Sequence, residues 1–269
     1  MTGREDTADA GRRALVDTYS AIDGRRVHAL VTGPLALATC ADSALEARRL
    51  VVVVPGLGLT RYVRVLATEV AARGATCAVL DLPGFAVRGP RGADAEIWSI
   101  GAHAAAWVRE RAGDRSVVLV GHSTGSQAAL TAALDLQDDD RDLSLVLAGP
   151  TFTPAQRRWP ALLRATATAY QDDRVSALDP REAVRGVFGI PRILLSGMAD
   201  APEDRVASLR VPLTLTAGVD DSFAPAWWLE RLAASAVAAP STRVVLIGGS
   251  HNNPDTHPVE LADVILTPP

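Results

Sequence analysis

Short apolar runs alternate with stretches of helical spacing along most of this 269-residue chain. Runs rich in β-branched and aliphatic residues predict strands, and the continuous runs at 50–54 and 117–120 predict strands buried on both faces. The predicted strands span 50–54, 76–80, 117–120, 143–148, 211–217 and 242–247. Apolar residues three or four positions apart predict helices; these span 62–72, 93–112, 127–136, 226–238 and 259–266. The alternation predicts an α/β fold, in which a mostly parallel central sheet is flanked by helices.

Two segments depart from this alternation. Residues 14–20 and 26–31 predict a pair of antiparallel strands, because the intervening Asp23-Gly24 is typical of a hairpin turn. Residues 150–209 show helical and loop-like patterns without a clear strand. We therefore expect a disordered N-terminus, a core domain in two pieces, and a helical insertion between these pieces. The ranges are 1–12 for the N-terminus, 13–150 and 210–269 for the core domain, and 151–209 for the insertion.

The apolar strand at 117–120 runs directly into Gly121-x-Ser123-x-Gly125, and a helix follows. A serine at such a tight strand-to-helix turn is strained and projects its hydroxyl above the sheet. The free N–H groups of the helix start favour a developing negative charge beside it. A side chain at position 121 or 125 would push strand and helix apart. The alternative is a glycine-rich turn without chemistry, but the strand and helix around it favour Ser123 as a nucleophile.

Composition narrows the classes of function. Apolar residues make up 48% of the chain, which is ample for a core. A net charge of −4 and a pI near 5.7 argue against nucleic acid or an anionic membrane as the main partner. All 27 basic residues are arginine, so there is no lysine for a Schiff base or a phosphate-binding loop.

The cysteines and the ends of the chain indicate a cytoplasmic protein. Cys40 and Cys77 are too few for a disulfide framework, and Cys77 lies in an apolar run typical of a core residue. The first residues are polar and charged, without the apolar segment of a signal peptide. No run approaches the roughly 18 apolar residues of a membrane-spanning helix. We therefore expect no membrane span.

Motifs spread over roughly residues 15–266 together resemble the α/β-hydrolase fold, and they follow that family's order. They are Pro55-Gly56-x-Gly58, Asp81-Leu82-Pro83-Gly84, the turn around Ser123, Gly218-x-x-Asp221 and Gly249-Ser250-His251. Their joint occurrence is far more specific than any one of them. In this resemblance the turn around Ser123 is the nucleophile elbow, and the insertion at 151–209 is a cap or lid.

The resemblance implies a base and an acid in loops that follow late strands, in the chain order serine, acid, histidine. His251 follows a predicted strand and a flexible glycine pair, so it is the expected base, with His257 as the alternative. Asp221 matches the family's Gly-x-x-Asp and is the expected acid, with neighbouring Asp220 as the alternative. His122 flanks the serine, and we expect its side chain to point away and support the turn.

The resemblance also implies an oxyanion hole made of backbone N–H groups. The donors fall on Thr124, after the nucleophile, and on Leu57, in the loop after an earlier strand. Many relatives carry His-Gly where this chain has Pro55-Gly56, so the loop's conformation is an open point, as is the alternative of a plain glycine loop. Apolar side chains of the insertion and of the acid loop are the expected substrate contacts; they are Phe152, Trp159, Leu163 and Phe223.

These features predict a serine hydrolase that cleaves a carboxylic ester, thioester or lactone of a medium-sized, largely apolar small molecule. One alternative is non-hydrolytic use of the same residues, in acyl transfer, cyclisation or carbon–carbon cleavage. Another is a ligand-binding protein that inherited the fold. No pair of His or Cys has zinc spacing, and Asp138-Asp139-Asp140 lacks the spaced ligands of a calcium loop, so we expect neither metal nor organic cofactor. The sequence leaves the oligomeric state open.

Overall fold

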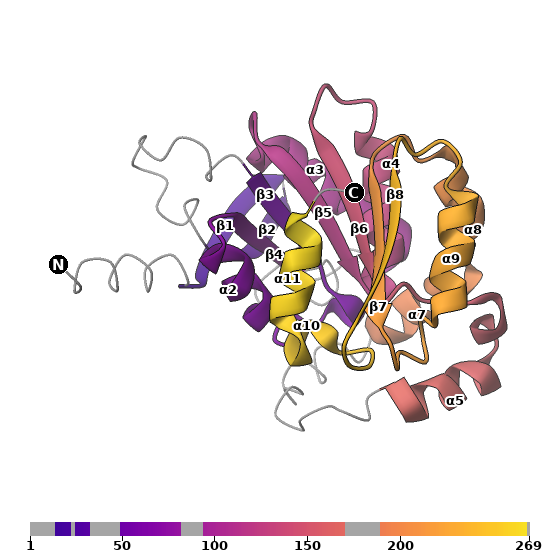
Figure 1. Ribbon diagram of the computed structural model, residues 1–269. Coiled ribbons are helices and arrows are strands. Elements are labelled where there is room, and N and C mark those ends of the chain that lie inside the picture. Colours follow the sequence, from indigo (N-terminus) through magenta and orange to yellow (C-terminus); the bar gives the residue numbers. More distant parts are fainter. Residues whose placement is uncertain (1–13, 23–24, 33–48, 82–93, 170–188, 268–269) are drawn as a thin grey trace.

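The computed structural model describes residues 14–22, 25–32, 49–81, 94–169 and 189–267. One eight-stranded sheet organises them, in the order β1-β2-β4-β3-β5-β6-β7-β8 (Figure 1). The strands are β1 (Val16–Ile22), β2 (Arg25–Thr32), β3 (Arg49–Val54), β4 (Thr76–Asp81), β5 (Ser116–His122), β6 (Leu143–Ala148), β7 (Leu213–Gly218) and β8 (Thr242–Ile247). The β1–β2 and β2–β4 pairs are antiparallel, and every other pair is parallel. The predicted α/β fold with a mostly parallel sheet is confirmed.

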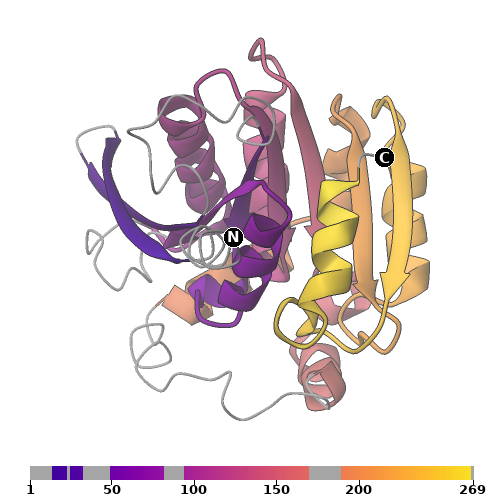
Figure 2. The same cartoon turned by 60° about the vertical axis from the view of Figure 1, so that its left-hand side comes forward.

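Helices cover both faces of the sheet. The helices of the described ranges are α2 (Arg64–Ala72), α3 (Ile97–Arg111), α4 (Thr124–Leu136), α5 (Trp159–Ala169), α7 (Gly189–Ala199), α8 (Pro202–Arg205), α9 (Ala226–Ser235), α10 (Asn253–Thr256) and α11 (Pro258–Leu266). Helices α3, α4 and α9 pack on one face and α2 and α11 on the other, as Figure 2 also shows. None of the helices within the described ranges is long and apolar enough to cross a membrane.

The strands are buried because side chains on each face meet a layer of helices. Along β3, Val52 and Val54 belong to the core beneath α3 and α4, whereas Val51 and Val53 belong to the core beneath α2 and α11. This two-sided burial explains why the sequence of such strands is continuously apolar rather than alternating. Strand β8, at the sheet edge, instead alternates between exposed and less exposed positions.

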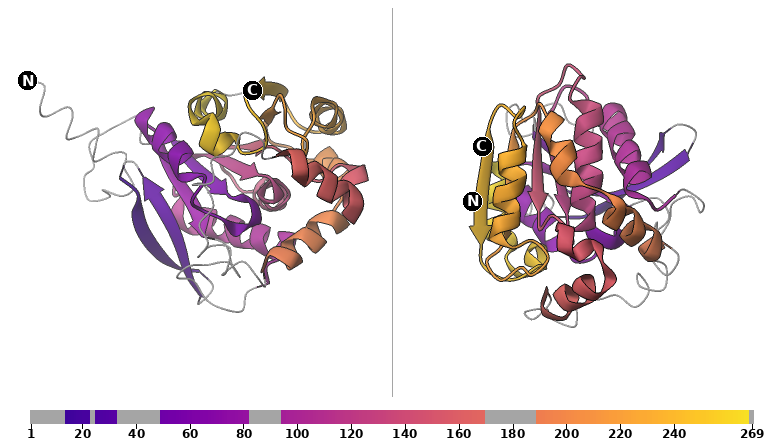
Figure 3. Two further views of the ribbon diagram at one scale, coloured as in Figure 1. Left: turned by 90° about the horizontal axis from the view of Figure 1, so that it is seen from below. Right: turned by 90° about the vertical axis from the view of Figure 1, so that its right-hand side faces the viewer.

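The carboxyl ends of the parallel strands share the lower edge of the sheet in Figure 1, and α5 and α7, from the insertion between β6 and β7, lie near it. The described part of the insertion begins with a 3₁₀ turn at Pro154–Arg157, continues with α5 and α7, and ends in α8 and a second 3₁₀ turn at Val206–Ser208. In the right-hand view of Figure 3, α5 lies below this edge. The fold thus brings the end of β5, the loops after β7 and β8, and the insertion to one side of the molecule.

Several sequence expectations concern positions outside the described residues. These positions are the N-terminus 1–12, the turn Asp23-Gly24, Cys40, the part of the Asp81 motif from Leu82 to Gly84, and the middle of the insertion. Within the described ranges, the predicted strands at 143–148 and 242–247 coincide with β6 and β8. Other predicted elements differ from the observed ones by a few residues at their ends, and α10 has no counterpart among the predictions.

Candidate active site

Ser123 sits in the sharp turn between β5 and α4, with a φ of 57° and a ψ of −128°. A positive φ is strained for a residue with a side chain. A Cβ on Gly121 would lie 2.5 Å from Gly125 O, and one on Gly125 would lie 2.2 Å from Val54 O. Both glycines are therefore required by close backbone approach, and the turn holds the serine at the carboxyl edge of the central strand.

The loop after β8 brings His251 to this serine. His251 Nε2 lies 2.9 Å from Ser123 Oγ, and His251 Nδ1 lies 2.9 Å from Asp221 Oδ2, in the loop after β7. All three residues are buried. A hydroxyl, an imidazole and a carboxylate are therefore linked in series, in the arrangement that lets an imidazole accept the proton of a serine.

Asp221 is held as a carboxylate. Burial raises the pKa of Asp221. The nearby His251 and the hydrogen bonds from His251 and from the Ala224 and Phe223 amides lower this pKa by more than burial raises it, so it lies below the ordinary value. Its Oδ1 accepts from Phe223 N at 2.8 Å and from Ala224 N at 3.1 Å. Neighbouring Asp220 is exposed. Of the two aspartates considered from the sequence, the structure brings Asp221 to His251.

A partly buried hydrogen-bond network joins the loop after β3 to the histidine loop. Gly56 N donates to Tyr62 Oη at 2.7 Å, and Tyr62 Oη lies 2.7 Å from His122 Nδ1. His122 Nε2 lies 2.9 Å from the carbonyl oxygen of His251. Burial, followed by repulsion from His251, lowers the pKa of His122 to about 3, so this ring is neutral. Its Nε2–H therefore donates to the His251 carbonyl. The sequence predicted a supporting side chain that points away from the site, whereas the His122 ring lies 5.0 Å from the His251 ring between centroids.

Gly149 and Tyr62 were missed by sequence reasoning. Gly149 follows β6 with a φ of 55°, and a Cβ there would lie 3.1 Å from both Asp221 Oδ2 and His251 Nδ1. A glycine directly after a strand, at the edge that carries the site, was the available signal. Tyr62 had no such signal, because its partner His122 is 60 residues away.

The loop after β3 lies against the start of α4. Leu57 has a φ of 50° within the 3₁₀ turn Gly56–Gly58, and its N–H donates to Thr124 Oγ1 at 2.9 Å. The two residues expected to form an oxyanion hole are therefore adjacent. In this structure the Leu57 amide is bonded to the Thr124 side chain.

The four expected substrate contacts fall into two groups. Phe152 and Phe223 are buried together in a small apolar cluster with residues of α5, and the Phe223 ring meets the His251 ring edge-on at 4.7 Å between centroids. Trp159 and Leu163 are 48% and 65% exposed, on the face of α5 away from that cluster. The structure thus brings Phe223 to the site and does not bring Trp159 or Leu163 beside it.

His257, the alternative base, is placed differently. Its ring packs on the glycine pair before His251, because a Cβ on Gly249 would lie 2.5 Å from its Nδ1. Its Nδ1 lies 3.0 Å from the hydroxyl of neighbouring Thr256. His257 therefore supports the loop that carries His251.

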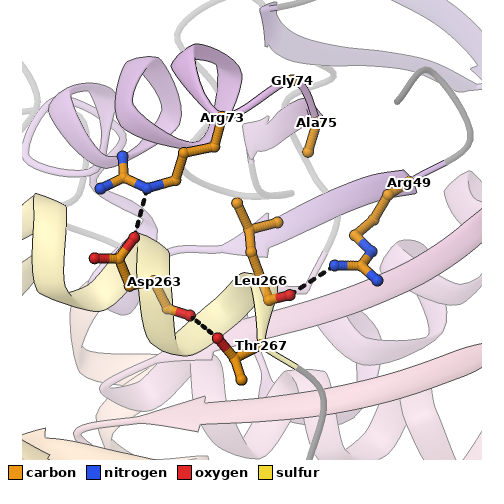
Figure 4. A pocket seen from close by; sticks show the side chains of 7 residues that line it. All are labelled: Arg49, Arg73, Gly74, Ala75, Asp263, Leu266 and Thr267. Atoms are coloured by element: carbon orange, nitrogen blue, oxygen red, sulfur yellow. Dashed lines mark hydrogen bonds and ion pairs between the residues drawn. The ribbon is translucent and has the colours of Figure 1, made fainter. Parts of the chain in front are cut away.

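A cavity of about 510 Å³ lies elsewhere, at the amino ends of the strands (Figure 4). Arg49 begins β3, and Arg73, Gly74 and Ala75 precede β4. The Arg49 guanidinium donates to Leu266 O, and Arg73 pairs with Asp263 and Glu69. These arginines hold α11 against the sheet, at the opposite edge from Ser123.

Comparisons with known proteins agree with this fold. The family model described as alpha/beta hydrolase fold matches residues 49–185. A thioesterase domain from the curacin biosynthetic pathway is 18% identical over 94% of this chain and 100% of its own, with a TM-score of 0.64. The enol-lactonase from Burkholderia xenovorans is 16% identical over 93% of this chain and 100% of its own, with a TM-score of 0.65.

A lipase-esterase related protein from Clostridium acetobutylicum is 12% identical, covers 89% of this chain and 98% of its own, and has a TM-score of 0.69. At such identities these likenesses concern the fold. A comparison with curated protein sequences found no match.

Proposed function

Because this chain belongs to the α/β-hydrolase fold family, we propose that it is a serine hydrolase acting through an acyl-Ser123 intermediate. The observation that carries the proposal is the series of hydrogen bonds from Ser123 Oγ through His251 to Asp221. The bond cleaved is that of a carboxylic ester, thioester or lactone. Names among the structural neighbours support this range, since they include a thioesterase, an enol-lactonase and a lipase-esterase related protein.

In the acylation half-reaction, Ser123 Oγ attacks the substrate carbonyl carbon while its proton passes to His251 Nε2. Asp221 keeps the hydrogen of His251 on Nδ1, which leaves Nε2 free to accept, and it stabilises the imidazolium that forms. Collapse of the tetrahedral adduct expels the alcohol, thiol or lactone oxygen, and His251 returns the proton to it. In the second half-reaction His251 takes a proton from water, whose oxygen attacks the acyl carbon. His251 then returns this proton to Ser123 Oγ as the bond to Ser123 breaks and the carboxylic acid leaves.

The developing negative charge on the substrate oxygen needs donors already in place. We assign this task to Thr124, the first residue of α4, whose backbone N–H directly follows Ser123; the turn at Leu57 lies against it. Apolar side chains around Phe223 favour an acyl group that is itself apolar, because each buried methylene contributes about 0.8 kcal/mol. The substrate is therefore a medium-chain or aromatic acyl compound.

Labelling with a fluorophosphonate probe, followed by peptide mapping, tests the nucleophile. We expect the probe on Ser123, and we expect Ser123→Ala to lose about four orders of magnitude in turnover, since no acyl-enzyme forms. The Ser123→Ala protein should fold as the wild type does. More than a tenth of wild-type activity in that variant would refute the mechanism, and turnover of a panel of esters, thioesters and lactones then identifies the reaction class.

A further inference from the structure

The side chain of Thr124 stands where a substrate oxygen would meet the Leu57 amide. Its Oγ1 accepts the hydrogen bond of Leu57 N–H at 2.9 Å. An oxyanion hole places its donors about 2.7–3.1 Å from the oxygen that they stabilise. The hydroxyl therefore fills the position that the expected donor would otherwise offer to substrate. Thr124 is only 2% exposed, so this contact is made inside the protein.

Thr124 itself retains two donors. A hydroxyl has one hydrogen and two lone pairs, and among the residues that the structure describes none accepts the hydrogen of Thr124 Oγ1. The backbone N–H of Thr124 belongs to the first residue of α4, where a helix has no internal partner for its N–H groups. No described backbone carbonyl accepts from it outside the helix. Both donors directly follow Ser123, which would carry the tetrahedral adduct.

We propose that Thr124 donates twice to the oxyanion, from its backbone N–H and from its hydroxyl, and that Leu57 acts through that hydroxyl. This inference rests on the function proposed above. Donation of Leu57 N–H to Oγ1 polarises the hydroxyl and strengthens the hydrogen bond that the hydroxyl itself donates. Thr124 is then a catalytic residue, and Leu57 is a positioning residue that does not touch the substrate.

The rival arrangement gives the hydroxyl the opposite role. If substrate displaced the Thr124 side chain and met Leu57 N–H directly, the hydroxyl would compete with the substrate oxygen for that donor. Removing it would then leave turnover unchanged or raise it. The two arrangements therefore predict opposite effects for the same substitution.

Steady-state kinetics of Thr124→Val on 4-nitrophenyl hexanoate separate them. Valine keeps the branched shape and removes the hydroxyl, so we expect kcat to fall by about 10²–10³ with little change in KM. Thr124→Ser restores the hydroxyl and should recover kcat to within about tenfold of wild type. Thr131→Val is the matched control on α4, because Thr131 lies about two turns further along the helix and its hydroxyl bonds Gln127 O and Arg205.

A second readout is inhibition by a hexyl trifluoromethyl ketone, whose adduct with Ser123 carries the oxyanion. Its inhibition constant should weaken in Thr124→Val in parallel with kcat/KM. If Thr124→Val does not fold, Thr124→Ala, which also lacks the hydroxyl, is measured in the same way. Unchanged or faster turnover without the hydroxyl, with Ser123 still labelled by fluorophosphonate, overturns this inference alone. A wild-type protein not labelled at Ser123 overturns both proposals.

Discussion

His251 is oriented from its ring and from its backbone. Asp221 holds Nδ1 and Ser123 faces Nε2, while the Phe223 and His122 rings lie 4.7 and 5.0 Å away between centroids. The backbone N–H of His251 donates to Ala169 O at the end of α5, and its carbonyl accepts from His122. A base held this closely loses little freedom when the reaction begins.

Replacing Asp221 by asparagine should reduce kcat by up to about 10⁴. Its Oδ1 accepts two backbone N–H groups, so the asparagine will keep its oxygen there and turn its NH₂ toward His251 Nδ1. Nδ1 must then act as acceptor, which places the ring hydrogen on Nε2 and prevents it from taking the proton of Ser123. Turnover of a 4-nitrophenyl ester by the purified variant measures the effect.

Asp220→Asn is the matched control, because it makes the same chemical change one residue away on an exposed side chain. We expect it to cost less than about tenfold in kcat. A larger loss in Asp220→Asn than in Asp221→Asn would transfer the role of the acid to Asp220.

His28 should make the stability of the protein depend on pH. It joins the first hairpin to β4, with Nε2 2.8 Å from Asp17 Oδ1 and Nδ1 2.9 Å from Asp81 Oδ2. Burial lowers the pKa of His28, but the hydrogen bonds and attraction of Asp81 and Asp17 outweigh burial, and the pKa lies above 6.5. A raised pKa means that the stabilisation is complete below pH 6.5 and is lost as pH rises through the folded-state pKa.

The difference in unfolding free energy between wild type and His28→Asn isolates this contribution. Urea unfolding should give a larger difference at about pH 5.5 than at about pH 8.5. Subtracting the unfolding free energy of the variant removes the contributions of titrating groups that both proteins share. A difference that is constant over this range, or that grows with pH, would show that His28 is not charged in the folded state.

At the scale of elements, the β5–α4 turn depends on how closely it approaches β3. A Cβ on Gly125 would lie 2.2 Å from the carbonyl oxygen of Val54, a backbone atom that cannot swing aside. Gly125→Ala should therefore lower the unfolding free energy by about 3 kcal/mol or more. Urea unfolding followed by circular dichroism measures it.

Gly113→Ala provides the comparison. Gly113 has a φ of 55°, but a Cβ there meets nothing within 4 Å. Only backbone strain of about 1–2 kcal/mol should result. Gly125 lies within α4 and is not among the glycines of positive φ, so its loss should come from the contact with Val54 alone. A loss in Gly125→Ala no larger than that in Gly113→Ala would contradict this account of the glycine at 125.

The sequence predicted helices and strands well where both faces of the element are buried and the element is long enough to show a pattern of apolar residues. Strands β3 and β5 contain continuous apolar runs because both of their faces meet helices. The four residues of α10 are too few for helical spacing to be visible. The contact between Leu57 and Thr124 spans 67 residues, and no local pattern encodes it.

At the scale of the whole molecule, the described insertion is attached directly to the loops that carry the site. Ala165 O and Ala169 O on α5 accept from Ser222 Oγ and His251 N. Further along the insertion, Gly197 O and Asp200 Oδ2 accept hydrogen bonds from the side chain of Gln127 on α4. The sequence predicted helices in this segment, but its division into a site-facing and an exposed surface became visible only once these partners were located.

The insertion should select the acyl group of the substrate through the buried face of α5. The face of α5 that packs on the site contributes Leu162 and Ala165 to the cluster with Phe152 and Phe223. An acyl chain on Ser123 that reaches this cluster gains about 0.8 kcal/mol for each buried methylene. Over a series of 4-nitrophenyl esters, kcat/KM for hexanoate should therefore exceed that for acetate by more than about tenfold.

Phe223→Ala should flatten this preference, because the ring next to His251 is removed, whereas Trp159→Ala should leave it in place, because Trp159 is 48% exposed on the opposite face of α5. Melting temperatures of both variants separate a change of preference from a loss of folding. If the wild type shows no chain-length preference, or if Trp159→Ala rather than Phe223→Ala changes it, the surface that meets the acyl group is not the one buried beneath α5. If Trp159→Ala is the variant that changes the preference, the exposed face of the insertion, with Trp159 and Leu163, is the specificity surface instead.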